Sequence, residues 1–485
     1  MGPLAGSLTM AWTWALRSRG AAHTEDVMRE ERDTGPVTPD RGEEGSAGNG
    51  GGVRSAARVG RRVAIVDGCR TPFARSSTVF KDLTAIDLGT LAVRELLNRA
   101  EIQGGAIDEV IYGTVVHSVK APNIAREVAL KAGIPPRVPA FSVSRACASS
   151  NQAITAGAEK IALGQGDVVL AGGAESLTNI PITVTDKLRD RLVAANNAKS
   201  LGQTLNAFKG LRPSELAPQA PAIAEYSTGE TMGEGAEKMA KLNDISREEQ
   251  DRWAFRSHDL AAKGTEDGRL TAEIAPVYLP PDYDEVVASD NGIRTDTSPE
   301  KLASLRPVFD RKYGSVTAGN SSPLTDGASA VLLMAEERAK ADGREPLGYI
   351  RSWAYSALDP REQLLQGPAF AVPQALDRAG LTMEDIDLWE MHEAFAAQVL
   401  SNLQWLDSDT FARERLGRSE KVGILPEERI NVMGGSIAIG HPFGATGGRV
   451  TITLLNEMRR RDAQFGLISV CAAGALGFAM VVERD

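Results

Sequence analysis

Apolar and polar positions along the chain follow two different periods, and the pattern changes from one to the other several times. Residues 62–67 form a mostly apolar run that predicts a buried strand, and a Gly-Cys-Arg-Thr-Pro turn follows it. Within residues 84–102 the apolar positions recur at helical spacing, and EVIYGTVV at 109–116 is again typical of a strand. Because strand and helix keep alternating, the pattern predicts an α/β fold of βαβ units around a parallel sheet.

An internal repeat extends this prediction. Residues 93–108 align with residues 372–387 without a gap, and residues 166–173 align in the same order with residues 466–473. In both copies of the longer match a helix leads through a turn into a strand. Two matches in the same order predict a duplicated α/β unit. The identical pairs of the longer match are Val93/Val372, Leu97/Leu376, Arg99/Arg378, Ala100/Ala379, Ile107/Ile386 and Asp108/Asp387.

Local composition divides the chain into segments. Residues 42–52 contain six glycines in eleven positions, and such a stretch buries too little apolar surface to offset its ordering entropy. Between the two copies of the repeat lies a long segment rich in Pro and small residues, which is typical of an insertion that covers substrate. We therefore predict a disordered extension at 1–60, an N-terminal half at 61–180 plus 306–343, an inserted loop (lid) domain at 181–305, and a C-terminal half at 344–485.

Overall composition excludes several classes of protein. The net charge of −10 disfavours a nucleic-acid partner, because such proteins present a basic patch or stripe. Three cysteines cannot form a disulfide framework, and their scarcity suits a reducing compartment, so we expect a cytoplasmic protein. The sequence contains no CxxC or HExxH motif and no apolar run of about 18 residues, so it predicts neither a metal site nor a membrane span.

The segment SRACASSNQA, residues 144–153, places Cys147 at the predicted start of an alanine-rich helix. The positive end of a helix dipole and the unpaired backbone N–H groups there favour a thiolate, so this position predicts a lowered pKa for the thiol. A reactive nucleophile needs such a setting. The alternative, an inert buried cysteine, is equally compatible with this segment taken alone.

Two histidines and a second cysteine stand where an α/β sheet gathers its ligands, beyond the carboxyl ends of strands. His441 lies in the glycine-rich GGSIAIGHPFGATGGR and can serve as the base for a cysteine. His392 follows a strand-like run and can orient a water or an oxyanion. Cys471 lies among small residues, and a core position is the stronger interpretation for it alone. A structural role is the interpretation for the remaining Cys and His residues, Cys69, His23, His117 and His258.

Five segments together resemble the thiolase family over roughly residues 60–485. The resemblance implies the thiolase fold: two duplicated βαβαβαββ halves forming a layered α-β-α-β-α core, with an inserted loop domain. His392 stands where most thiolases have Asn, and this variant resembles the β-subunits of fatty-acid oxidation (trifunctional) complexes. Ala475 replaces a family glycine. The segments are RACAS (145–149), GGAESL (172–177), TAGNSSPLTDGA (317–328), GGSIAIGHPFGATG (434–447) and CAAGALG (471–477).

The resemblance implies a 3-ketoacyl-CoA thiolase, an acyltransferase of fatty-acid β-oxidation that needs no cofactor and uses CoA as co-substrate. Cys147 resembles the acyl-accepting nucleophile, His441 its base, Cys471 the second acid and base, and His392 the holder of a water at the enolate oxygen. Further implied contacts are the backbone N–H groups of Cys147 and Ala473 for the tetrahedral oxyanion, and Ser322 for the pantetheine arm of CoA.

The resemblance also implies partners: a homodimer core, with a hydratase/dehydrogenase α-subunit beside it. Within residues 200–226, apolar residues edged by positive charge predict a stripe that contacts such a partner, lines an acyl tunnel or touches a membrane. A loop packed on its own domain is the plain alternative. Two other functions stay open, a short-chain acetoacetyl-CoA thiolase and a non-catalytic lipid-carrying or scaffold homologue. The absence of GxGxxG argues against a dinucleotide-binding oxidoreductase.

Overall fold

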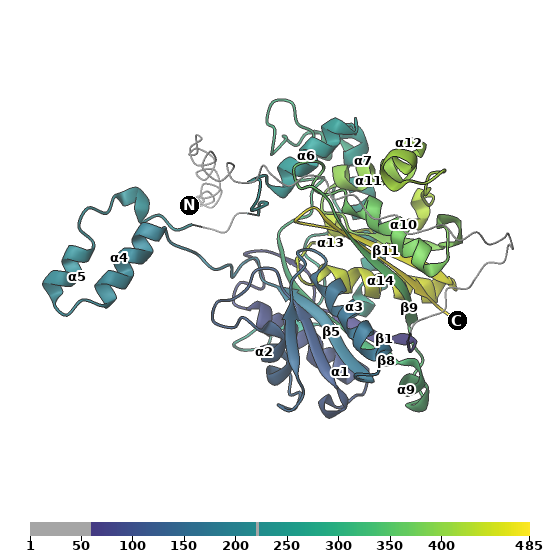
Figure 1. Cartoon of the computed structure of the whole chain (residues 1–485), viewed down its shortest axis with the longest axis horizontal. Coiled ribbons are helices and arrows are strands. Elements are labelled where there is room, and N and C mark those ends of the chain that lie inside the picture. The colour runs from purple at the N-terminus through teal and green to yellow at the C-terminus, as the bar shows by residue number, and fades with distance from the viewer. Residues whose placement is uncertain (1–59, 220–222) are drawn as a thin grey trace, which may run out of the picture. The chain divides into compact units, whose positions relative to one another are not determined.

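The computed structural model of the chain describes residues 60–219 and 223–485 (Figure 1). The extension predicted at 1–60 therefore lies, apart from Gly60, outside the described residues. None of the helices in the described ranges is both long and apolar enough to cross a bilayer.

The N-terminal half contributes five strands in the order β4-β3-β5-β8-β1. β3 runs parallel to both β4 and β5, whereas β8 runs antiparallel to β5 and β1. A short strand, β2 (Ala74–Arg75), pairs with the start of β8. The five strands are β1 (Val63–Arg70), β3 (Glu109–Gly113), β4 (Ala140–Val143), β5 (Val168–Glu175) and β8 (Thr325–Ala335).

The C-terminal half repeats this arrangement. Its strands follow the order β10-β11-β12-β9, with β10 parallel to β11 and the other pairs antiparallel. Ile430 forms a parallel bridge to Trp389 of β10, at the place that β4 takes in the first half. β1 and β9 pair over three residues and join the two halves into one sheet. These strands are β9 (Gly348–Ala357), β10 (Leu388–Met391), β11 (Phe465–Ala472) and β12 (Leu476–Glu483).

The predicted parallel sheet is therefore only partly right. Parallel pairing holds for β3, β4 and β5 and for β10 and β11, where a helix connects one strand to the next. It is wrong for β12, because a tight turn of three residues, 473–475, joins it to β11 as a hairpin. β1, β8 and β9 are antiparallel to their neighbours as well.

Three apolar cores alternate with the two halves of the sheet and give the layered arrangement. In the middle core, α3 and α14 pack between the halves, and the outer cores hold α1 and α2 on one side and α10 and α11 on the other (Figure 1). β8 shows the cause, because Val331 and Leu333 enter the middle core while Leu332 and Met334 enter an outer one. The helices are α1 (Ala85–Arg99), α2 (Ile124–Lys131), α3 (Ser149–Ala162), α10 (Gly367–Ala379), α11 (Ala396–Leu406) and α14 (Thr446–Arg461).

The sequence repeat is also a structural one, since α1 leads into β3 as α10 leads into β10. Its last identical residue has the same contacts in both copies. The Asp108 carboxylate accepts hydrogen bonds from the backbone N–H groups of Asp167 and Val168, at 2.7 and 3.0 Å. The Asp387 carboxylate accepts those of Gln464 and Phe465, at 2.8 and 2.9 Å. Each aspartate thereby fixes the start of the strand next to its own.

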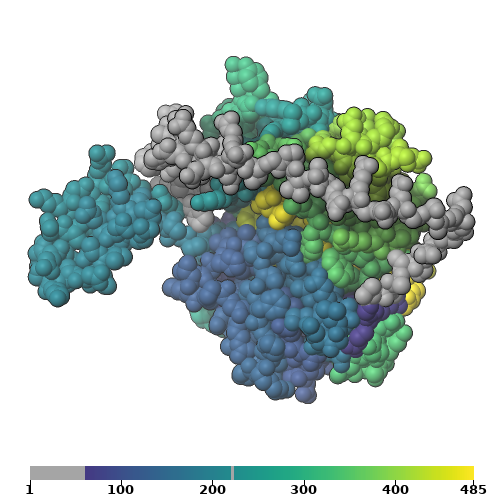
Figure 2. Space-filling model, viewed as in Figure 1, coloured from purple at the N-terminus to yellow at the C-terminus, as the bar shows by residue number. Residues whose placement is uncertain are grey.

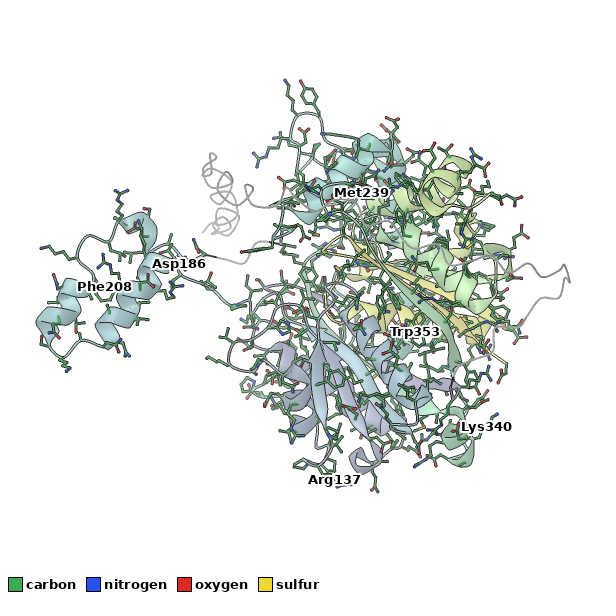
Figure 3. The ribbon with its side chains drawn as sticks, in the orientation of Figure 1. Arg137, Asp186, Phe208, Met239, Lys340 and Trp353 are labelled. Carbon is green, nitrogen blue, oxygen red and sulfur yellow. The ribbon has the colours of Figure 1, made fainter. Side chains whose placement is uncertain are left out.

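As far as the structure describes it, the chain between β5 and β8 carries five α-helices and a two-stranded sheet of β6 (Val277–Tyr278) and β7 (Val286–Val287) within long loops. α4 and α5 pack against each other and form a two-helix lobe, drawn in teal in Figure 2. Phe208, labelled in Figure 3, ends α5 in this pair. α7 packs on α13 (Ser436–Ile439) and so connects the segment to the C-terminal half. The helices of the segment are α4 (Asp186–Asn196), α5 (Leu201–Ala207), α6 (Met232–Leu242), α7 (Arg247–Glu266) and α8 (Pro299–Ala303).

Candidate active site

Both halves send predicted site residues to one place. Cys147 precedes α3, His441 lies between α13 and α14, and His392 directly follows β10. The Cys147 sulfur and one ring nitrogen of each histidine all lie within 4.8 Å of one another. The two imidazole rings are 4.1 Å apart between centroids. Cys471, near the end of β11, is close enough to Cys147 for the charge of one thiol to affect the other.

The loop before α3 holds Cys147 in a strained backbone. Ala146 has a φ of 44°, a conformation that costs a residue with a Cβ about 1 kcal/mol. Ser149 stabilises this turn, because its hydroxyl donates to the carbonyl of Ala146 and accepts the N–H of Arg145. Strain of this kind is typical of active sites, where the surrounding structure holds a residue in place.

The pKa predicted for Cys147 is wrong in direction. Burial raises the pKa of the thiol from 9.0 to about 12, although the backbone N–H groups of Ala473 and of Cys147 itself act to lower it. The loss of hydration around the sulfur thus raises the pKa by more than the N–H groups at the helix start lower it. Cys147 rests as a thiol and needs a base. The same two N–H groups are those predicted for the oxyanion, and both interact with the sulfur.

His441 is the residue predicted to be that base, and it lies beside the thiol. The Thr446 hydroxyl lies 2.6 Å from Nδ1 of His441. The backbone N–H of His441 donates to the Thr325 hydroxyl at 3.1 Å. Gly440 allows this approach, since a Cβ at its φ of 113° would lie 2.8 Å from Thr325. Burial lowers the pKa of His441 from 6.5 to about 3, so the ring is neutral. Within the described ranges its Nε2 has no hydrogen-bond partner, so this nitrogen can take a proton.

His392 is equally buried but has a different environment. Its Nδ1 lies 2.9 Å from the hydroxyl of Ser436, the first residue of α13. Arg449, fully buried on α14, donates to the same hydroxyl at 2.9 Å. Burial, with the charges of His441 and Arg449, lowers the pKa of His392 well below 6.5. Its Nε2 also has no hydrogen-bond partner in the part of the chain that the structure describes.

The hairpin of β11 and β12 carries the second cysteine and Ala473, whose N–H group is predicted to bind the oxyanion. Burial raises the pKa of Cys471 well above 9.0, while the N–H groups of Cys471 and Ala394 act in the opposite direction. Glu225, from the segment between β5 and β8, accepts the Gly474 N–H at 2.7 Å. Ala475, noted for replacing a glycine, takes a φ of 54°. The turn therefore keeps a conformation that favours glycine, with an alanine in it.

Sequence reasoning assigned no role to the two carboxylates that hold the site together. Glu175, the last residue of β5, accepts the N–H groups of Val115, Val116 and Gly444 at 2.9 to 3.0 Å, so it ties the His441 loop to the first half. Glu393 directly follows His392, and its carboxylate is buried. Its partners are Trp253, Ser257, Asn431 and the N–H of Ile437. Glu393 therefore connects α7 to α13 through hydrogen bonds.

A cationic hollow of about 140 Å³ has in its lining Ile437 of α13, the residue after Ser436. Arg75, Arg294 and Lys301 line it, beside one carboxylate, Asp296. Ser321 and Pro323 form another wall, so the hollow borders the chain on either side of Ser322, the residue predicted to contact CoA. The Ser322 N–H donates to the Ala394 carbonyl at 3.0 Å. No sequence motif indicated these cations, because residues far apart in the chain supply them.

Two family models together match almost all of the described chain. A family model described as the thiolase N-terminal domain matches residues 63–337, and the thiolase C-terminal domain matches residues 344–484. The chain belongs to the thiolase family. A 3-ketoacyl-CoA thiolase of Yersinia pestis is 53% identical over 428 residues, which is 88% of this chain and 98% of that protein.

Solved thiolase structures resemble the whole described fold. An acetyl-CoA acetyltransferase of Bacillus anthracis aligns with a TM-score of 0.76 and 32% identity, covering 88% of this chain and 99% of that one. Human mitochondrial 3-ketoacyl-CoA thiolase aligns with a TM-score of 0.75 and 32% identity, covering 88% and 100%. A further structure of that human enzyme is a complex with CoA.

Proposed function

We propose that this thiolase cleaves 3-ketoacyl-CoA with CoA, giving acetyl-CoA and a shortened acyl-CoA through an acylated Cys147. One observation carries the proposal: the Cys147 sulfur and the ring nitrogens of His392 and His441 meet within 4.8 Å, with a second thiol beside them. A nucleophile, a base and a second acid are the groups that this cleavage needs.

The first step forms the acyl–sulfur bond. His441 Nε2 takes the proton of Cys147, and the thiolate attacks the C3 ketone carbon of the substrate. Charge develops on the ketone oxygen, where the N–H groups of Cys147 and Ala473 donate to it. Because both N–H groups already interact with the resting thiol, they are in position before the oxyanion forms.

The second step breaks the C2–C3 bond. Its electron pair leaves as the enolate of acetyl-CoA, and the Cys471 thiol gives its proton to C2. A thiol with a raised pKa suits this step, since it carries a proton at neutral pH. His441, now protonated, and a water held by His392 donate to the enolate oxygen.

The third step releases the product. The thiol of a CoA molecule gives its proton to the Cys471 thiolate and attacks the acyl carbon, and Cys147 leaves and recovers its proton from His441. Cys147 recovers its own proton through His441, whereas the proton that Cys471 gave to acetyl-CoA is replaced by the proton of the CoA thiol. The reaction needs no redox or metal cofactor, because the thioester itself makes C2 acidic.

The cationic hollow suits CoA. The molecule as a whole carries a charge of −10, so Arg75, Arg294 and Lys301 form a local positive region in an acidic protein. The phosphates of CoA are the anionic part of the substrate, and we place them there. Ser322 then lies between the hollow and Ala394, where the pantetheine arm passes. In this arrangement the 181–305 segment acts as the lid.

Mass spectrometry tests the nucleophile. The protein is incubated with acyl-CoA in the absence of free CoA, and the intact mass is measured. We expect one acyl adduct on the wild type and none on Cys147→Ala. An adduct that persists in Cys147→Ala would contradict the assignment.

A short-chain acetyl-CoA C-acetyltransferase is the second candidate, since the acetyltransferase of Bacillus anthracis shares the fold. Kinetics on a series of 3-ketoacyl-CoA substrates decide between the two. The proposal expects kcat/KM to be higher for medium and long chains than for the four-carbon substrate. A strong preference for four carbons favours the acetyltransferase. No turnover with any chain length favours the non-catalytic homologue.

We further propose that the enzyme is a cytoplasmic homodimer that works beside a hydratase/dehydrogenase α-subunit. The two-helix lobe supports this docking role. α5 has no buried residue, and Leu201 and Leu205 are 75% and 66% exposed. Lys199 and Lys209 flank them, which gives an apolar stripe edged by positive charge. Co-purification of the native protein at low salt tests it, with Leu201→Asp plus Leu205→Asp as the control. Binding to vesicles with no co-purifying subunit would instead indicate a membrane contact.

A further inference from the structure

The two active-site histidines look alike but have differently connected hydroxyl partners. Each ring is buried and neutral, binds a hydroxyl through Nδ1, and presents an unpartnered Nε2 toward the site. A neutral imidazole carries its single N–H proton on one nitrogen, and the hydrogen bond at Nδ1 decides which one. The hydroxyl at Nδ1 therefore determines whether Nε2 donates or accepts.

Ser436 is constrained by Arg449. A guanidinium only donates, so the hydrogen bond from Arg449 uses a lone pair of the Ser436 oxygen. Among the described residues, the other partner of that oxygen is His392 Nδ1, at 2.9 Å. The Ser436 proton thus has one acceptor, His392 Nδ1. This hydrogen bond leaves the ring proton of His392 on Nε2.

Thr446 has a second acceptor. Its hydroxyl lies 3.1 Å from the carbonyl of Pro442, one turn earlier, and 2.6 Å from His441 Nδ1. When the hydroxyl donates to the carbonyl, its lone pair accepts the N–H of His441 Nδ1. No guanidinium occupies that lone pair, unlike the one on Ser436. His441 then has a bare Nε2.

We infer that Ser436, held by Arg449, and Thr446, held by Pro442, set opposite tautomers on the paired histidines, so that His392 presents a donor and His441 an acceptor. The inference rests on the proposed function, since it explains how two adjacent imidazoles divide the work. The bare Nε2 of His441 takes the Cys147 proton. The Nε2–H of His392 donates to the water at the enolate oxygen. Ser436 and Thr446 are positioning residues that act through the rings.

Nitrogen NMR reads the tautomers directly. Protein labelled with ¹⁵N-histidine is measured in the solid state, and the signals are assigned by their loss in His392→Asn and His441→Asn. We expect a protonated Nε2 on His392 and a protonated Nδ1 on His441. The same tautomer on both rings would overturn the inference. This readout needs no turnover, so opposite tautomers in a protein that does not cleave 3-ketoacyl-CoA would contradict the proposed function alone.

Kinetics separate the two hydroxyls. Ser436→Ala should lower kcat for thiolysis about tenfold or more while Cys147 is still acylated by acyl-CoA at near the wild-type rate, because that acylation uses His441 and no enolate. Thr446→Val should slow acylation about tenfold, and Thr446→Ser, which keeps the hydroxyl, should restore it. Equal loss of both rates in Ser436→Ala, or no rescue by Thr446→Ser, would indicate a structural role and overturn the inference.

Discussion

Strand β5 of the N-terminal half and strand β11 of the C-terminal half occupy equivalent places, and their last residues differ in use. β5 ends at Glu175, whose carboxylate accepts three backbone N–H groups and holds loops together. β11 ends at Cys471 and Ala472, where a thiol faces the nucleophile. Equivalent strand ends thus have different uses: the end of β5 binds the backbone of nearby loops, and the end of β11 brings a thiol to the candidate site.

The central helices show a similar division. α3 and α14 cross near their first turns, where the Ser150 hydroxyl accepts the Gly448 N–H at 2.8 Å. The loop before α3 supplies one residue of the candidate site, Cys147. The second half supplies His392 and His441 from loops and Cys471 from the end of β11. Duplication therefore explains where chemistry can occur, since equivalent loops meet, whereas the side chains at those loops determine which half performs it.

Replacing Cys471 should break this division with the largest effect. Cys471→Ala removes the proton donor to C2, so we expect thiolysis to fall about 10²- to 10⁴-fold. Acylation of Cys147 by acyl-CoA should persist at a reduced rate, because its leaving group is the CoA thiolate, which can leave without the proton from Cys471 that the enolate needs. The two rates are measured by thiolysis assay and by intact mass. Thiolysis within threefold of wild type would mean that another group protonates the enolate.

The paired aspartates test the duplication itself. Asp108→Ala and Asp387→Ala each leave two backbone N–H groups without their acceptor, and we expect each to destabilise the fold by about 2 kcal/mol. Asp→Asn at either position keeps an acceptor oxygen and should lose less. Urea unfolding of the four variants provides the measurement. A large loss of unfolding free energy for the variant in one half, with none for the variant in the other, would show that the two aspartates contribute unequally to stability.

His441, which is buried in the second half, makes the stability of the fold depend on pH. The pKa of His441 is about 3 in the folded protein against 6.5 for a free histidine, so below pH 6.5 the unfolded chain binds the proton first. Stabilisation is complete above pH 6.5 and decreases as pH falls toward 3. Relative to His441→Asn, the wild type should lose about 1.4 kcal/mol per pH unit in that window. Unfolding midpoints that change in parallel for both proteins would refute this.

The alternation of strands and helices and the four side chains that meet at the candidate site could be predicted from the sequence, because each depends on a local pattern or a short motif. Val331 to Met334 are buried in two different cores, so β8 lacks the one-sided alternation that would mark a strand, and it was not predicted from the sequence. The pKa of Cys147 was predicted in the wrong direction, because burial by distant segments outweighs the adjacent helix start. Arg294 and Arg75 line one hollow although they are far apart in the chain. Such contacts depend on the assembled fold.

The turn after β11 gives the smallest expected effect and the sharpest contrast between neighbouring residues. Ala475 has a φ of 54°, where its Cβ is strained, whereas Ala473 in the same turn keeps a negative φ. Ala475→Gly removes the strain and should stabilise the protein by about 1 kcal/mol. Ala473→Gly removes the same methyl group without relieving strain, so the added freedom of the unfolded chain should destabilise the protein by about 0.4–1 kcal/mol. Unfolding of both variants in urea compares them. If both changes destabilise, the buried Ala475 methyl contributes more through packing than it loses through strain.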